Sequence, residues 1–331
     1  MPASQLVIAR SVEFAPSLLV AGIFTFEILI AQAGRQSAAQ TNPVKRRLLY
    51  LALWALVAAF LAALLWFAFE AANMSGLPLT RAFSGGSWKT VFSATRFGHV
   101  WALRLGLIGV CLVLVTLRLR CNLEHAALRL LLWLFSFALL ISLAWISHAA
   151  AEGSQPFGLL NDALHLCVAA AWLGGLPCLA IYLTTTPPAT VTPILQRFST
   201  LSLCCVSVLV VSGIANAWLL VGSLVALFAT RYGALLLLKL ALFAILLGFG
   251  ARNRLLVKAN SRSAVAPPAL LARIRRNLRW EIGLGLGVVA VVGWLGATPP
   301  PRSSHLNGHD KLGDAATNWV DGAARFSLSD M

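Results

Sequence analysis

Charged residues are scarce in this chain. Only 11% of its 331 residues are Asp, Glu, Lys or Arg, whereas about a quarter of the residues in an average soluble domain are charged. Hydrophobic residues make up 59% and the mean hydropathy is +0.81, so the polar surface is too small to coat a water-soluble globule. This composition excludes a soluble enzyme, an extracellular disulfide scaffold and a disordered protein. A polytopic membrane protein remains.

The few charges are also unbalanced, with 26 Lys and Arg against 11 Asp and Glu. Membrane proteins retain Lys and Arg in cytoplasmic loops, which explains the excess without a nucleic-acid partner. The sequence contains no phosphate-binding glycine loop and no repeat with a period of about 20–50 residues. We therefore expect neither nucleic-acid binding nor a nucleotide-driven pump, and no enzymatic activity.

Long apolar runs dominate what is present. A helix needs about 20 mainly apolar residues to cross the hydrocarbon of a bilayer. None of the runs alternates apolar and polar residues in the manner of an outer-membrane barrel strand. The sequence therefore predicts an all-α bundle of about eight transmembrane helices. They cover approximately residues 6–32, 48–72, 97–117, 127–148, 160–183, 199–222, 232–251 and 279–297.

Lys and Arg are distributed unevenly between the two sides of this predicted bundle. Sixteen of the 26 fall in the first, third, fifth and seventh loops, and eight fall on the opposite side with both termini. Because Lys and Arg are retained in the cytoplasm, the odd loops are predicted to be cytoplasmic and both termini periplasmic. A signal peptide cleaved after Ala33 would place the basic residues 45–47 outside, so we expect the first span to be retained.

The segments outside the spans differ in character. Residues 1–297 are predicted to form one transmembrane domain, and 298–331, which opens with three prolines, a polar periplasmic tail. Residues 73–96 are rich in Gly, Ser and Thr and are expected to form a loop. The basic stretch 255–278 is expected to be a linker that is partly an interfacial helix.

Four ionisable residues lie within the predicted spans: Glu13, Glu27, Arg104 and Lys239. Such groups are costly in hydrocarbon unless they are paired or solvated, so each is a candidate functional residue. Pairing of the two basic residues with the two glutamates would fix the packing of the helices. A proton or ion path through a glutamate is the alternative.

Three histidines are predicted to lie at one depth near the outer surface. His99 begins the third span, His148 ends the fourth and His165 lies one turn into the fifth. A neutral imidazole nitrogen is a ligand for copper, zinc, nickel and iron. A single histidine at a helix end is usually interfacial, but three at one level favour a metal site.

Neighbouring residues fit a shell around these ligands. Asp162 and Trp145 each precede a histidine by three residues, and Trp172 follows His165 by two helical turns. Groups of this kind orient metal-binding imidazoles, and Asp162 is the expected hydrogen-bond partner of His165. The run of small residues at 169–175 predicts the close approach of a neighbouring helix.

The tail offers a second group of candidate ligands. His305 and His309 are four residues apart and Asp310 adjoins them. Together they could capture a metal ion and raise its local concentration beside the transmembrane site. A solvated tail without such a role is the alternative.

Several short motifs follow one another in a characteristic order. They are Phe97-Gly98 with Trp101 and Arg104; Ser147-His148-Ala149; Asp162 and His165 with the run 169–176; Arg197-Phe198-Ser199; Gly213; Thr230-Arg231-Tyr232-Gly233 with Leu235, Leu236 and Lys239; and Asn253. Their order and spacing resemble the CopD family of bacterial inner-membrane copper proteins, most strongly over residues 95–255.

The resemblance implies eight helices in the inner membrane, a role in copper uptake or tolerance, and a small periplasmic copper carrier of the CopC type as partner. The family's histidine positions correspond to His148 and His165, whereas the family more often has an apolar residue at the position of His99. The cargo would be a copper ion, as Cu(I) or Cu(II). With only three methionines, the chain has no methionine ladder for Cu(I).

Two other functions remain open at the level of sequence. His148 and His165 flank one short loop, so they could be axial ligands of haem b in an electron-transfer protein. Alternatively, the histidines and charges only pack helices in a membrane component without cargo.

Overall fold

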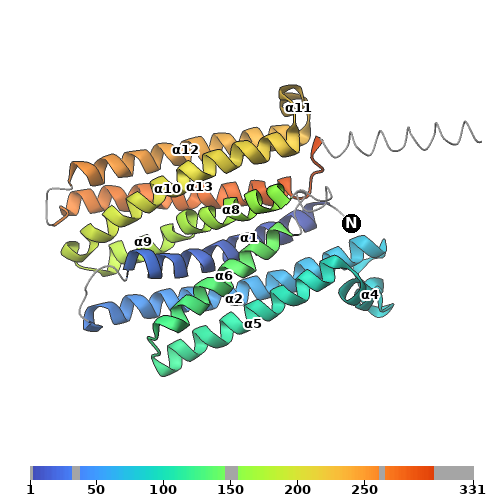
Figure 1. Cartoon of the computed structure of the whole chain (residues 1–331), viewed down its shortest axis with the longest axis horizontal. Coiled ribbons are helices and arrows are strands. Elements are labelled where there is room, and N and C mark those ends of the chain that lie inside the picture. Colours follow the sequence, from blue (N-terminus) through green and yellow to red (C-terminus); the bar gives the residue numbers. More distant parts are fainter. Residues whose placement is uncertain (1–2, 32–37, 146–155, 261–264, 302–331) are drawn as a thin grey trace, which may run out of the picture.

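The computed structural model describes residues 3–31, 38–145, 156–260 and 265–301. All regular elements in these ranges are helical (Figure 1). Eight spans are long and apolar enough to cross a membrane, which confirms the predicted all-α bundle. They are formed by α1 (Ala3–Phe26) with the π-helical turn η1 (Glu27–Ala31), α2 (Ala38–Ser75), α5 (Arg96–Cys121), α6 (Ala126–Ala144), α8 (Pro156–Leu173) with α9 (Gly175–Thr185), α10 (Pro188–Val221), α12 (Arg231–Ala259) and α13 (Pro268–Leu295).

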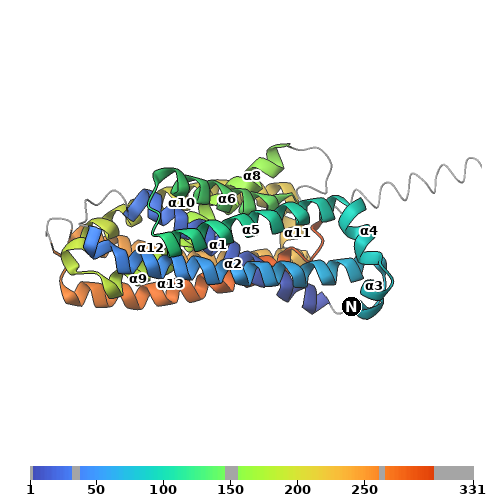
Figure 2. The same ribbon diagram turned by 90° about the horizontal axis from the view of Figure 1, so that it is seen from below.

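The helices run side by side along the long axis of the molecule (Figures 1 and 2). Helix α1 lies in the middle and packs against α2, α6, α8 and α13. The start of α1 and the end of α13 lie at the same end of the bundle, here called the terminal end, where the Arg10 side chain donates a hydrogen bond to the Gly296 carbonyl. The opposite end carries the basic residues of 252–258 and 273–279 and is called the basic end.

Two connecting segments are more helical than the sequence suggested. Residues 73–96, expected to be a loop, contain α3 (Leu79–Ser84) and α4 (Ser87–Ala94), and the Thr95 hydroxyl then caps α5 by accepting from the Gly98 N–H at 3.0 Å. The short α11 (Leu224–Ala229) precedes α12 in a similar way. The basic stretch 255–278 mainly extends α12 and α13 beyond the apolar runs, because Lys and Arg are good helix formers.

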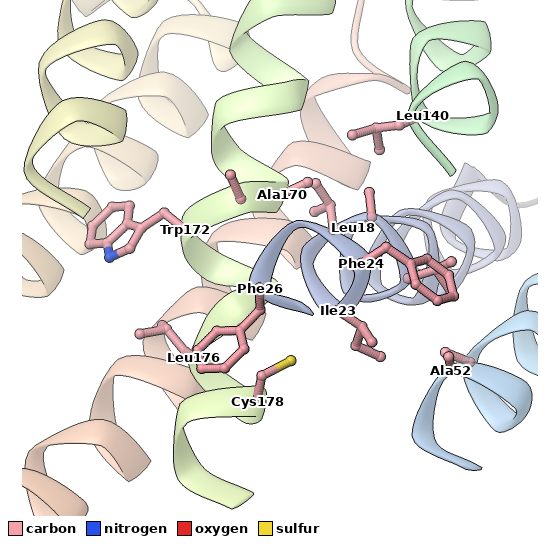
Figure 3. Packing of buried hydrophobic residues seen from close by; sticks show 14 of the residues in the cluster. Leu18, Ile23, Phe24, Phe26, Ala52, Leu140, Ala170, Trp172, Leu176 and Cys178 are labelled. Carbon is pink, nitrogen blue, oxygen red and sulfur yellow. The ribbon is translucent and has the colours of Figure 1, made fainter. Parts of the chain in front are cut away.

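The fifth span bends where α8 meets α9, at Gly174, and α1 crosses it there. A Cβ atom added to Gly174 would clash with the Leu18 carbonyl oxygen and lie 3.0 Å from the Cα atom of Gly22. Figure 3 shows the apolar side chains of α1, such as Phe26, packed around this crossing. The predicted close approach at the small-residue run is therefore confirmed.

The charges within the spans pair differently from the simplest expectation. Glu13 of α1 pairs with Arg104 of α5, as one of the predicted alternatives has it. Glu27, however, pairs with Arg118, whose Nη2 lies 2.6 Å from its Oε1, and not with Lys239. The sequence suggested a loop position for Arg118, but α5 continues to Cys121 and buries it.

Candidate metal site

A cavity of about 230 Å³ opens toward the terminal end of the bundle. Residues of α1, α2, α6, α8, α10, α12 and α13 line it, and most of them are apolar. Its charged and hydrogen-bonding side chains are those of Arg10, Trp66, Asp162, His165, Asn216, Tyr232 and Lys239. A cavity with an apolar wall and a few convergent polar groups is typical of a binding site for a small ligand.

His165 is held in one orientation by the neighbouring helix. Its Nδ1 atom lies 2.9 Å from the Ser212 hydroxyl oxygen of α10. That hydroxyl also lies 2.6 Å from the Val208 carbonyl oxygen, to which it donates its single proton. The serine oxygen therefore accepts the Nδ1 proton, and the neutral ring keeps its lone pair at Nε2, the form of imidazole that binds a metal.

The Nδ1 atom of His165 thus contacts Ser212, which the sequence analysis did not name, while Asp162 remains the partner predicted from the sequence. Asp162 also lines the cavity and attracts the Lys239 ammonium of α12 electrostatically. Lys239 lies close enough to act electrostatically on His165 as well. One carboxylate, one ammonium and one imidazole therefore meet here from two helices, and the carboxylate offsets the positive charge that would otherwise repel a metal cation.

Amide side chains fix the two helices that carry His165 and Ser212. Asn161 Nδ2 on α8 lies 2.9 Å from the Ser212 carbonyl oxygen and 2.7 Å from Asn216 Oδ1. Gly213 lies beside the imidazole, and a Cβ atom there would be in ordinary van der Waals contact with His165 Cε1, at 3.6 Å. The sequence analysis missed Ser212 and Asn161. The sequence signal that could have identified Ser212 is its position next to Gly213, one of the motif residues, within a mainly apolar span.

Arg10 closes the cavity toward the end of the bundle. Its guanidinium lies 3.8 Å from Glu70 Oε2 and 5.3 Å from the centre of the Trp66 ring, besides its bond to the Gly296 carbonyl. These contacts join α1, α2 and the end of α13. Since Glu70 accompanies Arg10 and Asp162 accompanies Lys239, the charges around the cavity are matched in number.

The other predicted site residues lie elsewhere or outside the described part of the chain. His148, His305, His309 and Asp310 fall in the segments that the structure does not describe. His99 is exposed on α5 and does not line the cavity, and Trp145 ends α6 with 41% of its surface exposed.

Trp172 is buried away from His165, with its ring centre 6.1 Å from that of Phe243. Within the described ranges, no three His, Cys, Asp or Glu side chains form a ready metal cluster. Among the described residues that line the cavity, His165 is the histidine and Asp162 is the carboxylate.

Comparison with known proteins identifies the family. Residues 1–157 match the family model of the copper resistance protein D-like N-terminal domain, and residues 192–295 match that of copper resistance protein D. The first match also covers the first two spans, which lie before the residues that carry the motifs. No solved structure matches the chain significantly.

Three relatives carry informative names. Copper resistance protein D of Pseudomonas syringae pv. tomato is 30% identical over 250 residues, covering 69% of this chain and 79% of that protein. Inner membrane protein YebZ of Escherichia coli is 31% identical, covering 69% and 77%. Copper transport protein CutJ of Bacillus subtilis is 29% identical over 68% of this chain, which spans only 43% of that longer protein. The chain is thus a multi-pass inner-membrane protein that belongs to the copper resistance protein D family.

Proposed function

We propose that this protein binds copper in the cavity at the terminal end, with Nε2 of His165 as a ligand, and carries the ion across the inner membrane. The observation that carries the proposal is the 2.9 Å contact of His165 Nδ1 with a Ser212 hydroxyl whose proton is already donated to Val208, an arrangement that favours a free lone pair at Nε2 beside a cavity. The names of the relatives support copper as the cargo.

The site would face the periplasm. Basic residues gather at the opposite end of the bundle, in 252–258 and 273–279, and Lys and Arg are retained in the cytoplasm. The terminal end, and with it the cavity, then lies on the side where copper enters the cell envelope. A periplasmic carrier of the CopC type, which the family resemblance implies, would deliver the ion to this side.

His148 is the proposed second ligand. It follows Leu143, which lines the cavity, by five residues, and five residues reach at most about 17 Å. The segment also leads directly into α8, the helix of His165. The family resemblance, in which a histidine position corresponds to His148, supports its proposal as a ligand.

Copper titration of the purified protein, with Cu(I) and Cu(II) in turn, tests the proposal. His165→Ala should lose the copper that the wild type binds, and His125→Ala is the matched control because His125 is exposed before α6. Equal copper binding by all three proteins would refute a site at His165. A Soret band in the absorbance spectrum would instead point to a haem protein.

Cell experiments then address transport. Copper should be measured separately in cytoplasm and periplasm of cells with the wild type, with His165→Ala and without the protein. We expect more cytoplasmic copper in cells with the wild type than in cells with His165→Ala or without the protein. If the cytoplasmic copper content is the same with and without the protein, the protein binds copper but does not transport it.

A further inference from the structure

Glu281 differs from the other buried carboxylates of the spans. It lies on α13 and is 3% exposed. Glu13 and Glu27 each pair with an arginine, and Asp162 lies near Lys239. Among the residues that the structure describes, Glu281 belongs to no ion pair.

The hydrogen-bond partner that the structure describes for Glu281 is a neutral amide, which a second amide supports. Asn253 Nδ2 on α12 lies 2.5 Å from Glu281 Oε1, and Asn277 Nδ2 lies 2.7 Å from Asn253 Oδ1. An amide donor satisfies one lone pair but brings no compensating charge. Because an ionised carboxylate without a cation is very costly in a low-dielectric interior, the group is stabilised there by binding a proton.

A second cavity adjoins this carboxyl group in the half of the bundle toward the basic end. It has a volume of about 230 Å³, and Glu281, Asn253 and Arg254 line it near that end. The hydroxyl-bearing residues Ser199 and Ser202 of α10 line it as well. Such groups can relay a proton through bound water.

The other charged residue that lines this cavity is Arg254. Its Nη1 atom is bound by Ser199, at 3.1 Å from the carbonyl oxygen and 3.3 Å from the hydroxyl oxygen. The lining residues from α8 and α9, Trp172 and Leu179, cannot titrate. Glu281 is therefore the carboxyl group of the cavity that can take up and release a proton.

The two cavities lie between the same helices. Residues of α8, α10, α12 and α13 line both. On α13, Val288 of the first cavity follows Glu281 of the second by seven residues, which corresponds to about 10 Å along the helix. The edge-to-face contact of Trp172 with Phe243 lies in the α8–α12 packing beside them. Helices α8, α10, α12 and α13 thus line both a cavity that contains a histidine and a cavity that contains a carboxyl group.

We propose that Glu281 is a proton-binding site, which exchanges its proton with water at the basic end through the second cavity, and that this exchange accompanies each passage of copper. On release, the carboxyl O–H bond breaks and the proton passes to water, leaving the carboxylate; uptake reverses the step. The coupling to copper rests on the proposed transport function, whereas the proton-binding site does not.

Infrared difference spectroscopy tests the site without copper. At neutral pH, the wild type should show the carbonyl band of a protonated carboxyl group, and Glu281→Gln should lose it. Glu124→Gln is the control, because Glu124 is 47% exposed and lies 3.1 Å from Lys45, so that this substitution should leave the band in place. A protonated-carboxyl band that is equal in wild type and Glu281→Gln at neutral pH would overturn the proposal, since Glu281 would then be ionised at that pH.

Proteoliposomes test the coupling. An imposed pH gradient should change the initial rate of copper uptake several-fold in the wild type, and Glu281→Gln should abolish that dependence while still binding copper at His165. Uptake that ignores the gradient in the wild type would overturn the coupling. If the wild type does not bind copper at all, the proposed function is refuted. The infrared experiment would still show whether Glu281 binds a proton.

Discussion

Glu13 and Arg104 form an ion pair in which neither side chain is exposed. Arg104 Nη1 also lies 2.7 Å from the Leu139 carbonyl oxygen and 2.6 Å from the Ser142 hydroxyl oxygen. Glu27 and Arg118 repeat the pair with the same separation of 91 residues. The second pair lies fourteen residues farther along both segments, or about 21 Å of helix. Two buried pairs thus hold the first and third spans parallel and in register.

Breaking the first pair should be strongly destabilising. Arg104→Met leaves the Glu13 carboxylate without its cation, and removal of one partner of a buried pair typically costs about 3–5 kcal/mol. The double variant Glu13→Gln, Arg104→Met should cost less than the single variant, because no unpaired charge remains. The free energy of unfolding in detergent measures both, and Glu124→Gln should change it by about 1 kcal/mol or less. The single variant Glu13→Gln completes the comparison. If the double variant loses as much free energy of unfolding as Glu13→Gln and Arg104→Met lose together, the two side chains do not act as a pair.

The crossing of α1 and the fifth span makes a second prediction. Gly174→Ala would place a methyl group against the backbone of α1 at Leu18 and Gly22. Overpacking typically costs about 1–3 kcal/mol, and backbone yields less readily than side chains, so we expect a loss at or above the upper end. Gly106→Ala is the matched control, since a Cβ atom there meets nothing within 4 Å. Thermal unfolding of the two variants should differ by several degrees, and equal curves would contradict a close-packed crossing.

The eight spans could be predicted from the sequence because length and hydropathy alone specify a membrane helix. The sequence could suggest that the glutamates pair with basic residues but not which residues pair, since that depends on the register of α1 against α5. Arg118 was misplaced because it lies beside Arg120 at the end of an apolar run, where Lys and Arg usually mark a loop. Only the packing of Glu27 against the last turns of α5 reveals it as buried.

The candidate site was predictable in part. His165 and its depth in the fifth span follow from the sequence, and so does the proximity of Asp162 on the same helix. The contact with Ser212 requires α8 and α10 to be placed side by side, which no spacing within one helix indicates. Glu281 was overlooked because it lies at the predicted start of the last span, where a carboxylate is usually interfacial, whereas α13 begins at Pro268 and buries it.

Ser212 should matter to copper binding although it is not a proposed ligand. Ser212→Ala removes the acceptor of the Nδ1 proton, so the ring loses its fixed tautomer and orientation. Removal of such a partner typically weakens metal affinity about tenfold to a hundredfold. The copper dissociation constant by competition titration measures the effect. Ser207→Ala, which removes an exposed hydroxyl of the same helix that lies 3.0 Å from the Leu203 carbonyl oxygen, should leave it unchanged.

A retained affinity in Ser212→Ala, with a lost affinity in His165→Ala, would mean that the ring is oriented by another group. Asp162→Asn then distinguishes the remaining candidate, because Asp162 lies one turn from His165 and lines the same cavity. An unchanged affinity in all three variants would place the copper ligand outside this cavity.

The orientation of the bundle is the last prediction. Reporters that are active on only one side of the membrane can be fused after Asn260, where α12 ends, and after Thr298, which follows α13. We expect a cytoplasmic signal from the first fusion and a periplasmic signal from the second. The reason is that the basic residues flanking the first position would otherwise have to cross the bilayer, at about 2.5–3.5 kcal/mol for each charge at the centre of a helix.

Charge substitution separates this cause from other constraints on insertion. Replacing Arg252, Lys258, Arg273, Arg275 and Arg276 together by Gln removes most of the positive charge that retains the segment, and should make the two fusions report mixed orientations. The same number of Gln substitutions of basic residues at the terminal end should leave both fusions with their original signals, because these residues oppose the orientation. A periplasmic signal from the fusion after Asn260 in the unaltered protein would mean that the bundle has the opposite orientation in the membrane. His165 would then face the cytoplasm, and copper would meet the Glu281 cavity first.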